Sequence, residues 1–279
     1  MRSIDARIVP AALAAVGLLL LAAPAFGSES SGAEAREGSA SAAVSDARAV
    51  EIARSVLAAM GGAEAWEATR YVSWRFFGRR LHFWDRHTGD IRSESPARRD
   101  REGVERPALL VLMNVHTRRG RAWENEVEVL DPAKLGEALD LGHQMWVNDS
   151  YWMFMPYKLL DPGVRLRYAG ERPLADGRPA DVLDLTFEPG VGYTPENRYE
   201  VYVGRDSGLV EQWSFYAEAS AGEPQFTLPW AGWMRFGRIL LATDHGEEAD
   251  WEIAVHDTLP AAVFTSRDRA ATERAAPSP

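Results

Sequence analysis

The chain has 279 residues, a formal net charge of −10 at pH 7 and no cysteine. Its acidic balance argues against binding to nucleic acid or to anionic membrane faces, which both attract basic surfaces. The lack of cysteine excludes disulfide bonds, thiol nucleophiles and cysteine-ligated metals. The fold must therefore be stabilised by its apolar core.

The N-terminus has the three parts of a secretory signal. Two arginines precede an apolar run over residues 8–23, and Ala25-Phe26-Gly27 ends it with small residues. We therefore predict a signal peptide over residues 1–27, whose removal leaves a periplasmic or secreted protein. A retained membrane span is the alternative, but the prolines and glycine within the run weaken it, so we expect no stable membrane anchor.

The rest of the chain divides by composition. Residues 28–44 are rich in Ser, Gly, Ala and Glu and contain almost no large apolar side chain, which predicts a disordered linker. Residues 266–279 have the same character and are predicted to be a disordered tail. Residues 45–265 are left as a single domain.

The predicted domain begins with a helix and continues with strands. Apolar side chains recur at helical spacing from Val50 to Met60, and Gly61-Gly62 ends the helix. A second short helical turn is predicted over residues 63–69. From Val72 the period changes to two, which is typical of strands. We expect strands near residues 72–76, 81–84, 109–115, 121–125, 164–168, 183–187, 199–203, 209–215, 234–243 and 251–256.

About eleven strands joined by short connections predict one antiparallel meander. A sheet of that size does not stay flat but curls, which predicts an unclosed barrel. The N-terminal helix and an internal helical section near residues 135–160 are available to fill its mouth. The predicted fold class is therefore α+β, mainly antiparallel β, with an internal helical plug or lid.

The segment 146–163 is the densest in large apolar side chains, and we call it the plug. Asn148 and Asp149 are expected to cap a short helix in it, because their side chains accept hydrogen bonds from free backbone N–H groups. Pro156 is expected to stop that helix. Asp161-Pro162-Gly163 is expected to close the plug as a turn.

Local motifs of the chain resemble an uncharacterised family of exported bacterial proteins. They are Ala59-Met60-Gly61-Gly62 with Trp66, Asn148–Trp152, Met155–Leu159 and Asp161–Gly163, within a resemblance that covers roughly Val50–Phe264. The layout of signal peptide, helix, antiparallel strands and lid is similar to that of the outer-membrane lipoprotein carrier superfamily. That similarity implies a half-barrel whose cavity holds an acyl chain, but no residue motif of the carriers' functional positions is matched here.

A ligand site is expected where the plug faces inward strand positions. An apolar ligand such as a lipid-like or acyl molecule suits a concave apolar space, and aromatic and methionine side chains adapt to it. A filled core made by the same side chains is the alternative. The candidate ligand-binding residues are Trp146, Tyr151, Trp152, Phe154, Met155, Tyr157, Trp74, Phe76, Trp213 and Phe215.

No motif for catalysis or metal binding is found in the sequence. The six histidines lack metal-ligand spacing, and His82, Asp85 and His87 around a turn are better explained as solvated residues. Asp149-Ser150 near His143 is the local candidate for a hydrolase, but capping explains it better. We therefore expect no cofactor, no metal and no catalytic residue. Asp184, Glu188 and Glu211 are expected on the wet face of the sheet.

Arg165 and Arg167 follow the plug on one face of a strand, with Lys158 nearby. They could bind a ligand headgroup at a cavity mouth. A solvated outer sheet face is the simpler explanation of their alternation with apolar residues.

Three classes of function remain open. The leading hypothesis is a non-enzymatic binding or carrier protein for a lipid-like apolar ligand. The second is a protein-interaction module of the cell envelope with no small ligand, whose partner the sequence does not identify. A hydrolase ranks third, because no nucleophile, base and orienting group are brought together by any motif.

Overall fold

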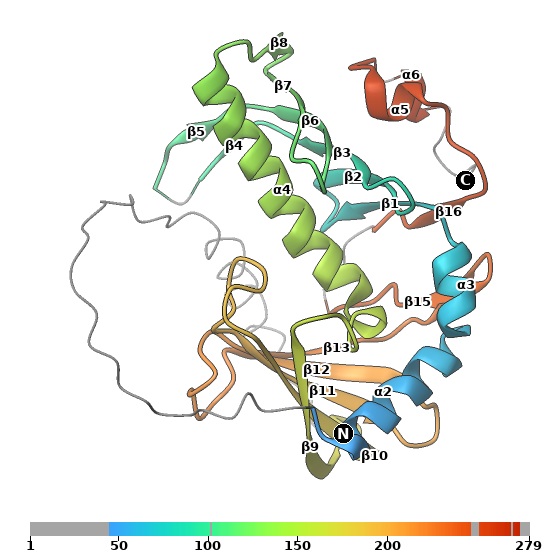
Figure 1. Cartoon of the computed structure of the whole chain (residues 1–279). Coiled ribbons are helices and arrows are strands. Elements are labelled where there is room, and N and C mark those ends of the chain that lie inside the picture. Colours follow the sequence, from blue (N-terminus) through green and yellow to red (C-terminus); the bar gives the residue numbers. More distant parts are fainter. Residues whose placement is uncertain (1–44, 101, 247–250, 269, 274–279) are drawn as a thin grey trace, which may run out of the picture.

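A computed structural model describes residues 45–100, 102–246, 251–268 and 270–273. The strands form two main antiparallel sheets (Figure 1). The large sheet has the order β16-β1-β2-β3-β6-β7-β8 and the small sheet has the order β13-β12-β11-β10-β9. The strands of the large sheet are β1 (Tyr71–Phe76), β2 (Arg80–Asp85), β3 (Asp90–Ser95), β6 (Leu109–Asn114), β7 (Gly120–Glu124), β8 (Val127–Glu128) and β16 (Ala254–His256). Those of the small sheet are β9 (Val164–Pro173), β10 (Pro179–Phe187), β11 (Arg198–Gly204), β12 (Val210–Tyr216) and β13 (Phe226–Pro229).

The predicted fold class is confirmed, with one difference in topology. The structure is α+β with antiparallel sheets and an internal helix, and neither main sheet closes into a barrel within the described residues. The expected single meander is wrong, because the strands before and after the internal helix belong to different sheets. The chain then returns to the large sheet, where β16 pairs with β1 and His256 lies opposite Tyr71.

The N-terminal helices α2 (Ala47–Ala59) and α3 (Gly62–Ala68) match the predicted helical segments. Asp46 caps α2, accepting a hydrogen bond from the Ala49 backbone N–H at 2.6 Å. The same carboxylate accepts the Tyr168 backbone N–H at 2.6 Å, which ties the start of the helix to β9. Burial of Ile52, Ala53 and Val56 places the predicted apolar face against the core.

The internal helix α4 (Pro132–Phe154) has 23 residues and is continued by a 3-10 turn, η1 (Met155–Tyr157). Asp131 caps it and Pro132 stands in its first turn, where proline needs no hydrogen-bonded N–H. The prediction that Asn148 and Asp149 start a short helix is therefore wrong, since both lie well inside α4. The stop near Pro156 is confirmed.

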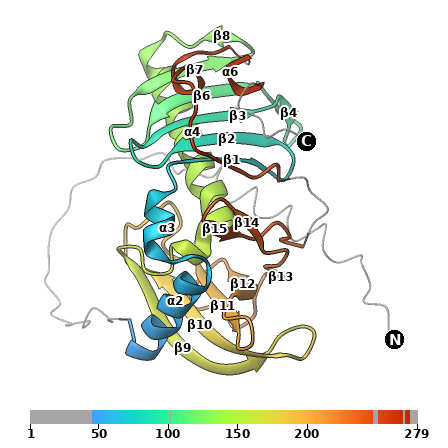
Figure 2. The ribbon, with the colours of Figure 1, turned by 90° about the vertical axis from the view of Figure 1, so that its right-hand side faces the viewer.

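One apolar core joins both sheets. Helix α4 runs from the large sheet to the small sheet (Figure 1), and Figure 2 shows the large sheet above the small one. Trp74 of β1 and Trp213 of β12 are fully buried in the same cluster as Trp152. The rings of Trp152 and Trp213 meet edge to face with centroids 4.6 Å apart. The two sheets therefore share a core rather than forming separate units.

Short elements complete the fold. Strands β14 (Met234–Phe236) and β15 (Ile239–Leu241) pair with each other, as do β4 (Arg98–Arg99) and β5 (Glu105–Arg106). Near the C-terminus, α5 (Ala262–Thr265) and α6 (Ala270–Glu273) follow β16. Fully buried Arg92 of β3 donates to the Val263 and Ser266 carbonyl oxygens at 3.2 and 2.7 Å, so part of the predicted tail contacts the large sheet.

The predicted signal peptide and linker lie outside the described residues. Among the helices that the structure does describe, none combines the length and apolar character needed to span a membrane.

Candidate functional site

A pocket with a volume of about 220 Å³ lies between the second half of α4 and the small sheet. Its remaining walls are the turn after η1 and the connection between β10 and β11, residues 188–197. Aromatic side chains dominate the lining: Trp146, Tyr151, Trp152, Phe187, Tyr193, Tyr199 and Phe215. The pocket is thus formed by the plug itself together with segments that follow it in sequence.

Helix α4 contributes a stripe of side chains to the pocket. Gln144, Val147, Asn148 and Tyr151 lie three and four residues apart, so they share one face of the helix. The Tyr151 hydroxyl is buried and has no hydrogen-bond partner among the described residues. Burial raises the pKa of this hydroxyl well above its usual value. Because the other three side chains of the stripe do not titrate, the stripe carries no charge at neutral pH.

The small sheet contributes inward side chains from three adjacent strands. Phe187 ends β10, Tyr199 lies in β11 and Phe215 lies in β12. Register places Tyr199 directly opposite Phe215, and their ring centroids are 5.4 Å apart. Side chains at alternate positions of a strand share a face, so this wall of the pocket continues into the buried core.

The connection between β10 and β11 is held over the pocket by hydrogen bonds of Tyr193 with His143 and Arg118, which we call the Tyr193 latch. The Tyr193 hydroxyl lies 2.6 Å from Nδ1 of His143 and accepts a hydrogen bond from Arg118 at 3.1 Å. Burial, with Arg118 nearby, lowers the pKa of His143 to about 4, so at neutral pH its Nδ1 can accept from the Tyr193 hydroxyl. Residue Val191 packs where a side chain on Gly163 would clash, at 2.4 Å from an added Cβ.

The charged groups at the pocket are paired with each other. Lys158 Nζ lies 2.9 Å from a carboxylate oxygen of Asp161, and both residues line the pocket. Arg165 pairs with Glu188 at 2.8 Å and Arg167 with Asp184 at 2.6 Å, and neither arginine is part of the lining. The headgroup hypothesis for these two arginines is therefore wrong, and the outer-face interpretation is confirmed.

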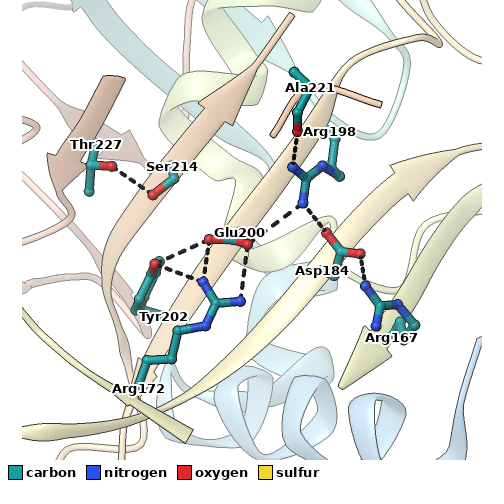
Figure 3. Close-up of polar contacts among 9 residues, drawn as sticks. All are labelled: Arg167, Arg172, Asp184, Arg198, Glu200, Tyr202, Ser214, Ala221 and Thr227. Carbon is teal, nitrogen blue, oxygen red and sulfur yellow. Dashed lines mark hydrogen bonds and ion pairs between the residues drawn. The ribbon is translucent and has the colours of Figure 1, made fainter. Parts of the chain in front are cut away.

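Asp184 belongs to a polar network on the opposite face of the small sheet (Figure 3). Arg198 lies between Asp184 at 3.1 Å and Glu200 at 3.6 Å, and Arg172 donates two hydrogen bonds to Glu200 at 2.7 and 3.0 Å. Asp184 and Glu200 are each paired with arginines, so they do not form a pair of free carboxylates that could act as general acid and base. Asp184 lies on the face of the small sheet away from the core, as expected, but it is buried under its arginine partners rather than wet, with 8% exposure.

The structure divides the ten candidate ligand-binding residues into two groups. Four line the pocket: Trp146, Tyr151, Trp152 and Phe215. Six are packed in the shared core away from it: Trp74, Phe76, Phe154, Met155, Tyr157 and Trp213. The core residues face neighbouring rings; Phe154, for example, meets Trp74 edge to face at 5.2 Å. Their contact with a ligand stays a prediction that their packing does not favour.

Asp149 forms a buried polar cluster with two residues of β2. Arg80 donates to both of its carboxylate oxygens at 2.7 and 2.6 Å, and His82 Nε2 lies 2.7 Å from one of them. Burial alone would raise the pKa of Asp149, but Arg80 and His82 outweigh it and the pKa lies below its usual value. The cluster therefore holds α4 to the large sheet through a charged carboxylate.

The cluster also contains a serine, histidine and aspartate in contact. Ser93 Oγ lies 2.9 Å from His82 Nδ1, and all three residues are inaccessible to solvent, with exposures of 0%. A nucleophile needs access to its substrate, so this arrangement is structural. The hydrolase candidate from sequence is not assembled either, because Ser150 donates to the Val147 carbonyl oxygen and His143 contacts Tyr193.

The interpretation of His82 and Asp85 as solvated turn residues is wrong, because both lie in β2 and are buried, with exposures of 0 and 4%. His82 points to Asp149, whereas Asp85 accepts hydrogen bonds from Arg70. Within the described part of the chain, no group of three or more histidine, aspartate or glutamate side chains is placed to hold a metal ion.

The candidate residues from sequence do not include Phe187, Tyr193 and Tyr199 of the lining, nor His143, which holds Tyr193. The alternation of β10 and β11 marks Phe187 and Tyr199 as inward, so both can be found from sequence. Tyr193 had no such signal, since the segment Gly190–Pro195 has turn composition and no periodicity.

Comparisons with known proteins give only distant similarities. No protein-family model matches the chain, and no curated protein matches it in sequence. A DUF1329 family protein from Desulfovibrio piger is 14% identical, with a TM-score of 0.39 over 77% of this chain and 97% of that one. A putative outer membrane lipoprotein-sorting protein domain from Vibrio parahaemolyticus is 13% identical, with a TM-score of 0.39 over 78% and 96%. MucB is 17% identical, with a TM-score of 0.26 over 77% and 69%. At these scores the similarities carry no argument about family or function.

Proposed function

We propose that the protein is a non-enzymatic binding or carrier protein, exported to the periplasm or secreted, that holds a lipid-like apolar ligand in the pocket beside α4. The observation that carries this proposal is the aromatic lining of the pocket of about 220 Å³ between α4 and the small sheet. Removing apolar surface from water stabilises a complex by roughly 25 cal/mol per Å² before the costs of association.

Two features of the site favour binding over catalysis, and a third gives the pocket a way to open. The charged pair Lys158–Asp161 is satisfied internally. The serine–histidine–aspartate contact of Asp149 is buried away from the pocket. The Tyr193 latch joins residues 188–197 to α4 and to the β6–β7 turn, so one connection can open the pocket without unfolding either sheet.

The test is native mass spectrometry of protein purified from its own host under non-denaturing conditions. We expect a stoichiometric adduct of low mass that is released on denaturation. Val147→Phe, which fills the pocket from the helix, should be purified without the adduct. Leu141→Phe on the same helix is the matched control, because Leu141 is exposed and does not line the pocket. Wild-type protein with no adduct and no saturable binding of any apolar probe would reject the proposal and leave the interaction module as the better hypothesis.

A further inference from the structure

The pocket is small for a long acyl chain. Its volume of about 220 Å³ exceeds that of a cavity of about 150 Å³ known to accept benzene. The pocket is thus about one and a half times the volume of that benzene cavity, so part of a sixteen-carbon chain would lie outside it. Two fused aromatic rings, in contrast, fit within it as a whole.

The shape of the lining also favours rings. Tyr151 contacts Phe187 and Tyr199 with ring centroids 5.8 and 5.5 Å apart, so the walls meet at aromatic faces and edges. An aromatic ligand gains from such face and edge arrangements beyond simple burial, whereas an alkyl chain gains from burial alone.

The charge of the site favours a neutral molecule. Lys158 and Asp161 neutralise each other at 2.9 Å, and the pKa of His143 of about 4 leaves that ring uncharged at neutral pH. A carboxylate entering the pocket would lose water and meet no unpaired cation in the lining, which costs binding free energy. The remaining polar groups on the helix stripe are neutral: the amides of Gln144 and Asn148 and the hydroxyl of Tyr151.

We infer that the ligand of this pocket is a compact neutral aromatic molecule of one or two fused rings, rather than a long-chain fatty acid. This inference rests on the proposed binding function at the same pocket, and it replaces the lipid-like ligand proposed above with an aromatic one. It follows from the juxtaposition of a small volume, aromatic walls and internally paired charges.

Three probes test the inference by isothermal titration calorimetry: 1-naphthol, its charged relative 1-naphthoate, and hexadecanoate below its micelle concentration. We expect 1-naphthol to bind at a ratio of one to one, and each of the other probes to bind at least tenfold more weakly. Val147→Phe, or Gln144→Trp if the first variant does not fold, should abolish binding of 1-naphthol. Leu141→Phe should bind it like the wild type.

The outcomes separate the two proposals. Hexadecanoate binding as tightly as 1-naphthol or more tightly, and lost in Val147→Phe, would overturn the ligand class and keep the binding function. Equal affinity for 1-naphthol and 1-naphthoate would overturn the requirement for a neutral ligand. Binding of 1-naphthol that Val147→Phe leaves unchanged would overturn the site. No binding of any probe would overturn both the inference and the proposed function.

Discussion

The second half of α4 presents two faces that are similar in composition and different in surroundings. On the side toward the large sheet, Asp149 is buried beside Arg80 and His82 of β2. Near the end of the helix, Phe154 is buried in the shared core and packs against Trp66 and Trp74. The other face carries Val147 and Tyr151 toward the pocket. A cluster of aromatic side chains therefore does not by itself identify a binding site. The site is identified by the space that remains between the second face and the small sheet, beside the contacts of Tyr151 with Phe187 and Tyr199.

The largest expected difference between the faces comes from removing a ring. Phe154→Ala should lower the free energy of unfolding by about 3–5 kcal/mol, because it leaves a cavity among fixed neighbours. Tyr151→Ala should cost about 1–2 kcal/mol, since it enlarges a space that already exists. Urea unfolding of both variants measures the difference. Equal losses would mean that the pocket face is as tightly packed as the core face.

The next effect concerns the charge on the packed face. Asp149→Asn should lower the free energy of unfolding by about 3 kcal/mol, because it leaves the buried partners Arg80 and His82 without their carboxylate. Asp140→Asn is the matched control on the same helix, since Asp140 pairs with Arg118 in the solvent. It should change stability by less than about 1 kcal/mol. A similar cost for the two variants would contradict the structural role given to the buried cluster.

A smaller effect separates two glycines of α4. An added Cβ on Gly142 would lie 2.7 Å from a methyl group of Val111, whereas one on Gly136 would meet nothing within 4 Å. Gly142→Ala should therefore destabilise by about 1–3 kcal/mol despite the gain in helix propensity. Gly136→Ala should stabilise by up to about 1 kcal/mol. Thermal melts of the pair report how closely the helix approaches β6, and a stabilised Gly142→Ala would show that the contact is loose.

The smallest expected effect is a pH dependence that belongs to the packed face. The pKa of Asp149 is lower in the folded protein than its usual value of 3.8. Its contribution to stability is therefore complete above about pH 4 and is lost as the pH falls through the folded pKa. We expect wild-type protein to lose stability more steeply than Asp149→Asn in urea melts between pH 5 and pH 2.5. Parallel slopes would assign the acid sensitivity to other carboxylates.

The sequence predicts local elements well and their assembly less well. Alternation of apolar residues locates β11 and β12, and helical spacing with Gly61-Gly62 locates α2, because both signals are local. No local sequence signal indicates that the strands before α4 and those after it pair in different sheets. Asp149 is expected as a cap because aspartate favours that position. Its real partner Arg80 is 69 residues away, so only the tertiary structure reveals a buried ion pair.

The candidate site, too, is predicted by sequence only where the signal is local. The density of rings in the plug predicts the region of the pocket, and Trp146, Tyr151 and Trp152 line it. The plug does not predict which of its rings face the pocket, because that depends on where the small sheet lies. Tyr193 could not be found from sequence, since its role comes from contacts with His143 and Arg118 across the fold.

The pairing of β16 with β1 has a consequence for how the chain folds. Ser73 and His256 are 183 residues apart and their side chains lie 2.8 Å from each other, and Trp251 belongs to the core that includes Trp74. Contacts of such high sequence separation slow folding, because the entropy of closing the loop is lost before the contact stabilises it. The large sheet therefore cannot complete its edge until the residues of β16, Ala254–His256, have been synthesised. Until β16 pairs with it, the edge of β1 is open and can pair with another unfinished chain. Folding only after β16 is available therefore avoids this route to aggregation.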